Sequence, residues 1–240
     1  MSIDKKRLKQ LKIFQKKIKI YFEDLNILNQ AFKHPSLTNE KEKPHQENNQ
    51  RLEFLGDAVL ELAVSEYLYR HYQFLTEGQM TKIRAFTVCE PTLAKIGRQL
   101  YLGNYLILGK GEENTGGREK DSILADTLEA LIGAIYIDRN YSTAYDFIIK
   151  NLEKIILKAI DGEWGMDYKT NLQEVLQKSD SERVLYNVIK ESGPDHDKIF
   201  YVEVVWKSMI LGTGIGKSKK QAEQKAAKAA LVKINDHRKI

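Results

Sequence analysis

The stretch RLEFLGDAVLEL, residues 51–62, carries three carboxylates at four-residue intervals within an otherwise apolar segment. They are Glu53, Asp57 and Glu61. If the segment is a helix, residues four apart lie on the same face, so the three side chains form one stripe among apolar neighbours. A poorly solvated carboxylate is costly unless it is paired or binds a metal. Arg51 lies nearby but not in the stripe, so the pattern predicts a neutralising partner from elsewhere.

Composition limits the class of protein. The 240 residues are 42% hydrophobic and 30% charged, which is typical of a globular chain with one large or two ordinary domains. No run approaches the length of a membrane span, and the basic N-terminus lacks the apolar core and cleavage site of a secretory signal. The single cysteine, Cys89, excludes an internal disulfide framework and a cysteine zinc site. These features predict a cytoplasmic protein without a membrane segment.

Charge is unevenly distributed along the chain. Lys/Arg and Asp/Glu number 11 and 6 in residues 1–48, 13 and 17 in residues 49–166, and 14 and 10 in residues 167–240. An acidic middle between basic ends fits a cation-binding centre flanked by surfaces that hold a polyanion. Ordinary solvated charge explains such modest differences better when they stand alone, so this interpretation depends on the motifs.

The first two thirds of the sequence predict helices. The polar segment 38–50 and the glycine-rich segment GKGEENTGGREKD, 109–121, predict loops, and Gly162 and Gly165 mark a linker or helix stop at 161–167. Apolar residues repeat at helical spacing in 7–18, 25–33, 51–72, 79–86, 91–100, 122–137 and 142–159.

The character of the sequence changes after residue 167. YKTNLQEVLQK, from residue 168, predicts a short amphipathic helix, and three segments rich in β-branched and aromatic residues predict strands. An alanine-rich helix follows, with Ser218 and Gln221 spaced as a capping box at its start. The order α-β-β-β-α predicts helices on one face of an antiparallel sheet. The fold class is therefore mainly α, with an all-helical domain followed by a small α+β domain.

The residues Gly216-Lys217-Ser218 match the end of a nucleotide-binding phosphate loop, but the rest of that motif is missing. Its leading glycine would fall at residue 211, which is leucine. The preceding strand also belongs to a β-meander rather than a βα crossover, so no nucleotide cofactor is expected. Lys217, Lys219 and Lys220 remain at a helix N-terminus, where free N–H groups and the helix dipole favour phosphates.

Residues 168–237 resemble a double-stranded-RNA-binding domain. The segments NLQE, GPDHDKIF and GIGKSKKQAEQKAA stand in the order that this family shows. In the family, the first helix and the loop between the first two strands enter successive minor grooves, while lysines of the last helix hold phosphates across the major groove. The resemblance implies these RNA contacts: Thr170, Gln173, Glu174, Pro194, His196, Lys217, Lys219 and Lys220.

Nearly the whole chain resembles bacterial ribonuclease III. NNQRLEFLGDAVLEL, 48–62, resembles the family's defining motif, and AFKHPSL, EGQMTKIRA, GKGEENTGGR and LADTLEALIGAIYID match its other blocks in order. The resemblance implies an endonuclease domain over residues 1–163 and the RNA-binding domain over 168–237. One departure is Gln50, where the family often has a glutamate; it removes an outer carboxylate and leaves the inner four.

These four carboxylates indicate which neutralising partner the first stretch requires, namely a bound cation. Glu53 and Asp57 lie one turn apart, and Asp126 and Glu129 lie three residues apart on a second apolar stretch with no cation in their own turn. For either pair alone, a metal site and a solvated or arginine-paired stripe are about equally good explanations. Both pairs together, with the family resemblance, imply a Mg²⁺ site, with Mn²⁺ as a substitute, in which a water is activated and the leaving 3′-oxygen is stabilised.

The resemblance also implies individual roles. Asp57 and Glu129 are expected to be catalytic and to bind the metal directly, with Glu53 and Asp126 completing or orienting the metal ligands. Glu77 matches a family glutamate that lies near the cleavage site. Glu61 matches no position that the family requires to be acidic.

The implied activity is metal-dependent hydrolysis of both strands of double-stranded RNA, leaving 5′-phosphate and 3′-hydroxyl ends with short 3′ overhangs. Expected substrates are ribosomal RNA precursors and other structured transcripts. Cutting both strands in one visit needs two carboxylate sets, so we expect a homodimer that joins through Phe54, Leu55 and Val59. One alternative is a catalytically idle double-stranded-RNA-binding regulator, which the intact carboxylates disfavour. A DNA nuclease is disfavoured by the RNA-binding domain's preference for A-form duplex.

Overall fold

The computed structural model describes residues 3–40, 48–160, 168–177, 182–194 and 198–237. The chain forms two compact units, of which one comprises Met1–Tyr72 and Met80–Lys154 and the other Gln73–Gln79 and Ile155–Ile240. The linker expected at 161–167 and the middle of the loop expected at 38–50 lie outside the described residues. Within the described part of the chain, no helix has the length and apolar character to cross a membrane.

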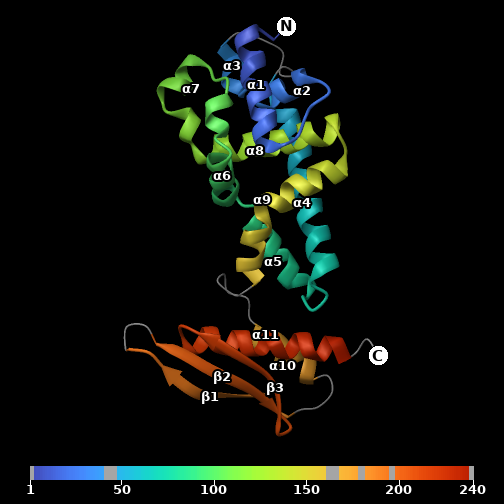
Figure 1. Ribbon diagram of the computed structural model, residues 1–240, viewed down its shortest axis with the longest axis vertical. Helices are drawn as coiled ribbons and strands as arrows, with labels where there is room; N and C mark the ends of the chain where they lie inside the picture. The colour runs from blue at the N-terminus through green and yellow to red at the C-terminus, as the bar shows by residue number, and fades with distance from the viewer. Residues whose placement is uncertain (1–2, 41–47, 161–167, 178–181, 195–197, 238–240) are drawn as a thin grey trace. The chain divides into compact units, whose positions relative to one another are not determined.

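Every helix that apolar spacing predicts in the first two thirds of the chain is present. The fold class is therefore confirmed for this part, which contains helices and short 3-10 turns (Figure 1). The predicted helices are observed as α1 Lys5–Ile18, α2 Leu25–Ala31, α4 Gln50–His71, α5 Glu77–Thr87, α6 Glu90–Gln99, α8 Asp121–Asp138 and α9 Tyr141–Ile160.

Several short elements fall where loops were predicted or outside any predicted helix. They are α3 Pro35–Glu40, η2 Leu102–Tyr105, α7 Lys110–Asn114 and η3 Gly117–Glu119. The glycine-rich stretch 109–121 is thus partly helical, which corrects the prediction of a loop. Two ion pairs hold it in place: Arg118 pairs with Glu113 at 2.6 Å and Lys120 pairs with Glu112 at 2.6 Å. These two ion pairs favour a helical conformation in a segment whose glycines would otherwise favour a loop.

Helix α8 is the centre of the first unit. It packs against α4, α6 and α2, which surround it in Figure 1. Its buried residues face every direction around the helix, which explains why the stretch is apolar almost throughout. They are Ile123, Leu124, Ala125, Thr127, Leu128, Ala130, Leu131, Ile132, Gly133, Ala134 and Ile135.

Helices α4 and α8 cross with their backbones almost in contact, and a glycine on each helix permits it. A Cβ on Gly56 would lie 1.8 Å from the carbonyl oxygen of Glu129, and a Cβ on Gly133 would lie 2.2 Å from the carbonyl oxygen of Leu52. Real Cβ atoms do not approach backbone atoms so closely, so any larger residue would push the helices apart. The crossing brings the first carboxylate stripe against the second.

The C-terminal elements have the predicted order. They are α10 Tyr168–Gln177, β1 Leu185–Ser192, β2 Ile199–Trp206, β3 Met209–Gly216 and α11 Lys219–His237. The strands form an antiparallel sheet in the order β1-β2-β3, with irregular register at Val188/Lys190 and at Val204/Val205. Helix α11 packs on β2 and β3 and against α10 (Figure 1). The predicted α-β-β-β-α fold is confirmed.

The glycine crossing leads to a stability prediction. We expect Gly133→Ala to lower the free energy of unfolding by about 2–3 kcal/mol or more, because the added methyl group must displace backbone rather than a flexible side chain. Gly78→Ala is the control, since a Cβ there meets nothing within 4 Å; it should leave stability unchanged or raise it by up to about 1 kcal/mol. Urea unfolding of both variants measures the difference. Equal stability of Gly133→Ala and the unmodified protein would contradict the close crossing.

Candidate active site

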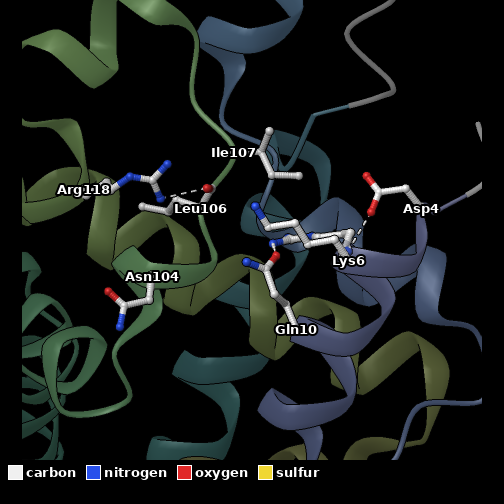
Figure 2. Close-up of a pocket in the computed structure, with 8 residues that line it drawn as sticks. Asp4, Lys6, Gln10, Asn104, Leu106, Ile107 and Arg118 are labelled. Carbon is white, nitrogen blue, oxygen red and sulfur yellow. Dashed lines mark hydrogen bonds between the residues drawn. The ribbon is translucent and has the colours of Figure 1, made fainter.

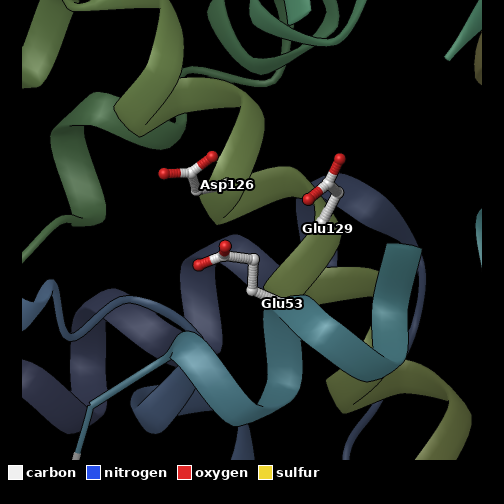
Figure 3. A group of neighbouring side chains, drawn as sticks. All are labelled: Glu53, Asp126 and Glu129. Atoms are coloured by element: carbon white, nitrogen blue, oxygen red, sulfur yellow. The ribbon is translucent and has the colours of Figure 1, made fainter. Parts of the chain in front are cut away.

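Three carboxylates from α4 and α8 converge in the first unit. Figure 3 shows Glu53 on α4 with its carboxylate turned to the side of Asp126, and Glu129 beside them on α8. One oxygen from each residue lies within 4.8 Å of the others, and all three side chains are half-buried. Asp126 and Glu129 share one face of α8 because they are three residues apart. The glycine-permitted crossing places that face against Glu53.

The cluster holds its negative charge without a paired cation from the described part of the chain. Among the described residues, none of the three carboxylates forms an ion pair. Burial, followed by repulsion from Asp57 and the other carboxylates, raises the pKa of Glu129 to about 8. Burial and repulsion from Asp126 and Asp57 raise the pKa of Glu53 to about 7. The pKa of Asp126 is also raised, first by burial and then by Glu90. The metal-free group therefore retains protons at neutral pH.

Asp57 lies beside this group but is not a member of it. Its side chain is exposed, and it does not share the 4.8 Å grouping of the other three carboxylates. It is still close enough to raise the pKa of both Glu53 and Glu129 through like-charge repulsion. The structure thus brings together three of the four predicted carboxylates and leaves the fourth at the edge of the site.

The residues present fit a hard divalent cation. Magnesium prefers carboxylate and water oxygens in an octahedral arrangement, usually with one or two carboxylates and several waters. Three unneutralised carboxylates whose oxygens already converge form such a donor set. A cation here would remove the repulsion that raises the pKa values, so it would stabilise the arrangement as well as bind to it.

Two further glutamates that the sequence singled out, Glu61 and Glu77, are not members of the three-carboxylate group. Glu61 is exposed on α4, and Glu77 is exposed in the first turn of α5. Gln50 begins α4, where its Oε1 accepts a hydrogen bond from Asn48 Nδ2 at 3.3 Å. The side chain of Gln50 therefore helps to hold the start of the helix rather than extend the acidic group.

The predicted RNA contacts occupy exposed positions of the C-terminal fold. Thr170, Gln173 and Glu174 lie on one face of α10, because they are three and four residues apart, and all are exposed. Pro194 is exposed after β1, while His196 lies outside the described residues. Three exposed lysines lie at the start of α11, one of which also pairs with Glu191 at 3.1 Å: Lys217, Lys219 and Lys220.

A capping box fixes the lysine-bearing end of α11, as predicted. The backbone N–H of Gln221 donates to Ser218 Oγ at 3.2 Å, and the Gln221 side chain accepts from the backbone N–H of Lys217 at 2.7 Å. Gly212, Gly214 and Gly216 let β3 approach this helix, since a Cβ on each would lie within 2.6 Å of α11 backbone. The cap and the glycines hold the basic helix end firmly against the sheet.

The sequence reasoning missed three residues that shape the site. Gly56 and Gly133 permit the close crossing of α4 and α8. The sequence signal that could have revealed them is a glycine inside a predicted helix, because glycine weakens a helix and often marks a close packing contact. Glu90, at the start of α6, adds to the field on Asp126. Its position beside Asp126 depends on tertiary packing, so no local pattern marks it.

Comparison with known proteins assigns a family to both parts of the chain. Residues 24–156 match a family model described as ribonuclease-III-like, and residues 168–234 match the double-stranded RNA binding motif. Ribonuclease 3 of Pelotomaculum thermopropionicum is 49% identical over 224 residues, which cover 93% of each chain. Ribonuclease 3 of Syntrophomonas wolfei is 53% identical over 205 residues, covering 85% of this chain and 87% of the relative.

A solved structure is similar to the helical part. The nuclease domain of ribonuclease III from Campylobacter jejuni is 41% identical, with a TM-score of 0.54, and the match covers 59% of this chain and 94% of that one. A helical unit with a carboxylate cluster and a second unit with a double-stranded RNA binding motif define an endonuclease that acts on double-stranded RNA. The chain belongs to the ribonuclease III family. That family is metal-dependent, in agreement with a cluster that has the donors for a metal.

The raised pKa values predict how stability depends on pH. In metal-free protein, Glu53 and Glu129 hold protons in the folded state at a pH where the unfolded chain, with carboxyl pKa values of 4.5, has released them. The folded state binds more protons in this window, so the free energy of unfolding should fall as pH rises from about 5 to about 8. Urea unfolding in EDTA at several pH values measures this slope.

Glu129→Gln is the informative variant, because it removes a carboxyl whose pKa is raised to about 8 and should flatten the slope. Glu61→Gln removes an exposed carboxylate on α4, the helix that carries Glu53, and should leave the slope unchanged. A slope that is equal in the unmodified protein and in Glu129→Gln would contradict a buried, unneutralised Glu129.

Proposed function

We propose that this endoribonuclease uses Mg²⁺, with Mn²⁺ as a substitute, to cut both strands of double-stranded RNA. The products carry 5′-phosphate and 3′-hydroxyl ends with short 3′ overhangs. Its substrates are ribosomal RNA precursors and other structured transcripts in the cytoplasm. The observation that carries the proposal is the convergence of three unneutralised carboxylates in a chain that also contains a double-stranded RNA binding motif.

Asp57 and Glu129 are proposed as the catalytic residues and direct metal ligands, with Glu53 and Asp126 completing or orienting the ligand set. Glu129 supports this role because it is half-buried, lies with two other carboxylates and has its pKa raised to about 8. Asp57 lies at the rim, where like-charge repulsion disfavours a fourth carboxylate in a metal-free cluster. Glu77 is proposed as a supporting residue at the cleavage site.

Each group in the site has a physical task. A magnesium ion held by these carboxylates would supply activation of a water and stabilisation of the leaving 3′-oxygen of the cut strand. In metal-free protein at neutral pH, Glu129 is mostly protonated and Glu53 is about half protonated, and cation binding would release these protons. The helix crossing keeps the carboxylates in position, so little reorganisation is needed when RNA arrives.

The proposed division of labour follows the two parts of the chain. We place the endonuclease domain at residues 1–163 and the RNA-binding domain at residues 168–237, supported by family matches over 24–156 and 168–234. The exposed residues of α10 and the lysines of α11 are proposed to hold the duplex across its grooves. The lysines of α11 that would hold phosphate and the carboxylates that would bind metal then lie on separate domains.

A homodimer is proposed because each carboxylate cluster cuts one strand and a two-fold axis supplies the second cluster. Phe54 is 81% exposed and Leu62 is 55% exposed, eight residues apart on the same face of α4. Such side chains favour burial against a partner. Val59 is only 5% exposed and packs in the core, so it does not belong to the contact region that the sequence suggested. The Campylobacter jejuni structure is described as containing a region involved in dimer formation, which also supports the proposal.

Glu129→Gln should separate binding from cleavage. The amide keeps the size of the side chain but is a poorer ligand for a hard cation than a carboxylate, so turnover should fall by orders of magnitude. Affinity for duplex RNA should persist, because the proposed contacts lie in the other domain. Gel shift and cleavage of one labelled RNA hairpin, at low and high Mg²⁺, measure both properties, and high Mg²⁺ should restore part of the rate.

Glu61→Gln is the matched control for this experiment, and it should cut at the rate of the unmodified enzyme. Cleavage by Glu129→Gln at the unmodified rate in limiting Mg²⁺ would exclude Glu129 as a ligand. Loss of folding together with binding would make the role of Glu129 structural. Absence of cleavage by the unmodified protein under any Mg²⁺ concentration would favour the catalytically idle RNA-binding regulator.

Phe54→Asp should produce monomers. A charge at the centre of an apolar contact leaves a desolvated carboxylate in the interface, so association should weaken by orders of magnitude. Tyr101→Asp, at a side chain that is 59% exposed elsewhere in the same unit, should remain dimeric. Sedimentation velocity at micromolar concentration distinguishes the two. A monomeric unmodified protein that still cuts both strands would contradict the dimer.

A further inference from the structure

Helix α1 carries a charge that neither the carboxylate cluster nor the C-terminal motif uses. Its fourteen residues, KKRLKQLKIFQKKI, include seven basic side chains and no acidic one. This segment is the basic N-terminal end of the charge pattern along the chain. Its inner face is occupied by Leu11, Phe14 and Ile18, which are buried in the core.

Four lysines form a stripe along the outer face of α1. They recur at intervals of four, three and four residues, which places them on one side of the helix. All four are exposed, and at about 1.5 Å of rise per residue the stripe is about 16 Å long. With Leu8 and Ile13 they line a shallow groove of about 330 Å³. We call the following residues the lysine stripe: Lys5, Lys9, Lys12 and Lys16.

Helix stability does not explain this arrangement. Lys5, Lys6 and Arg7 all lie in the first turn, where the positive end of the helix dipole disfavours cations. Within the lysine stripe, residues four apart carry like charges, which also weakens a helix. In the part of the chain that the structure describes, no residue of the stripe forms an ion pair. The stripe is therefore a concentration of positive charge without an internal partner.

The positive surface continues around α1 into a second hollow of about 540 Å³ (Figure 2). Lys6, Arg7 and Arg118 line it, and its single lining carboxylate, Asp4, caps the helix by accepting from the backbone N–H of Arg7 at 2.8 Å. Arg7 donates from Nε to Asn29 at 2.7 Å and from Nη1 to the carbonyl oxygen of Tyr105 at 2.8 Å. Its Nη2 is buried and has no hydrogen-bond partner among the described residues. Arg7 thus adds a positive charge beside the stripe, partly offset by the nearby Asp4 carboxylate.

We propose that the lysine stripe of α1 binds the phosphate backbone of duplex RNA, as a contact surface separate from both the carboxylate cluster and the C-terminal motif. The proposal rests on the proposed function, because it assigns this surface to the same substrate. Four lysines over about 16 Å give about one charge per 5 Å, the same order as the phosphate spacing along one strand of a duplex. Ile13 is 52% exposed but the apolar face is buried in the core, so the helix offers little to a lipid bilayer.

The test compares the salt dependence of RNA binding in full-length variants. Lys5→Gln, Lys9→Gln and Lys12→Gln are combined, because glutamine has nearly the same helix propensity as lysine. Affinity for a labelled RNA hairpin is measured in EDTA at several salt concentrations. The slope of log K against log salt should decrease in magnitude by about 2 to 3, and affinity near physiological salt should fall about 10- to 100-fold.

A control variant carries the same change of charge elsewhere in the first unit, at the exposed residues Lys95, Lys150 and Lys154. Its slope should equal that of the unmodified protein. An unchanged slope in the α1 variant, or an equal decrease in both variants, would overturn the proposal. So would a lowered melting temperature with an unchanged slope, which would make the lysines structural, or stripe-dependent binding to anionic lipid vesicles with unchanged RNA binding. Because binding in EDTA needs no metal, failure here is distinguishable from failure of Mg²⁺-dependent cleavage by the unmodified protein.

Discussion

The near contact between the backbones of α4 and α8 is the constraint on which the site depends. Gly56 and Gly133 allow it, because any Cβ at either position would collide with a carbonyl oxygen of the opposite helix. Each glycine weakens its own helix by about 0.5–1 kcal/mol relative to alanine. Both helices therefore lose some intrinsic stability at their glycines. In return, acidic residues of the two helices come close enough to form one site.

This meeting stores repulsion in the folded protein. Glu53, Asp126 and Glu129 converge without an ion-pair partner among the described residues, and the pKa values of all three are raised. Native proteins place such strain at functional sites more often than elsewhere. A divalent cation relieves it, so the free energy that the metal-free fold loses to repulsion becomes available for metal binding.

Much of the fold could be predicted from periodicity. The helical spacing of apolar residues located α1, α4 and α8, and the β-branched segments located all three strands. Helix α7 was missed because its glycines predict a loop, whereas ion pairs between Arg118 and Glu113 and between Lys120 and Glu112 hold it. Such pairs join residues whose proximity depends on the folded shape of the segment.

The candidate site could be predicted less completely. Spacing alone placed Asp126 and Glu129 on one face, and the family resemblance joined them to Glu53. Spacing could not show that Asp57 lies at the edge of the cluster, because it depends on the rotation of α4 about its own axis. The same rotation buries Val59 and exposes Phe54, so it also decides which apolar residues are free to meet a partner. Packing against α8 sets the rotation of α4 about its axis, and the local sequence of α4 does not predict this packing.

The most direct measurement counts the protons that leave when the metal binds. Isothermal titration calorimetry of Mn²⁺ or Mg²⁺ binding, in buffers of different ionisation enthalpy at neutral pH, gives this number. With pKa values of about 7 for Glu53 and about 8 for Glu129, we predict release of about one to two protons per cluster near pH 7, falling toward zero above about pH 9. Glu129→Gln should bind metal more weakly and release fewer protons. Tight metal binding with no proton release at pH 7 would contradict the account, because it would mean that the carboxylates were already ionised in metal-free protein and that burial and repulsion had not raised their pKa values.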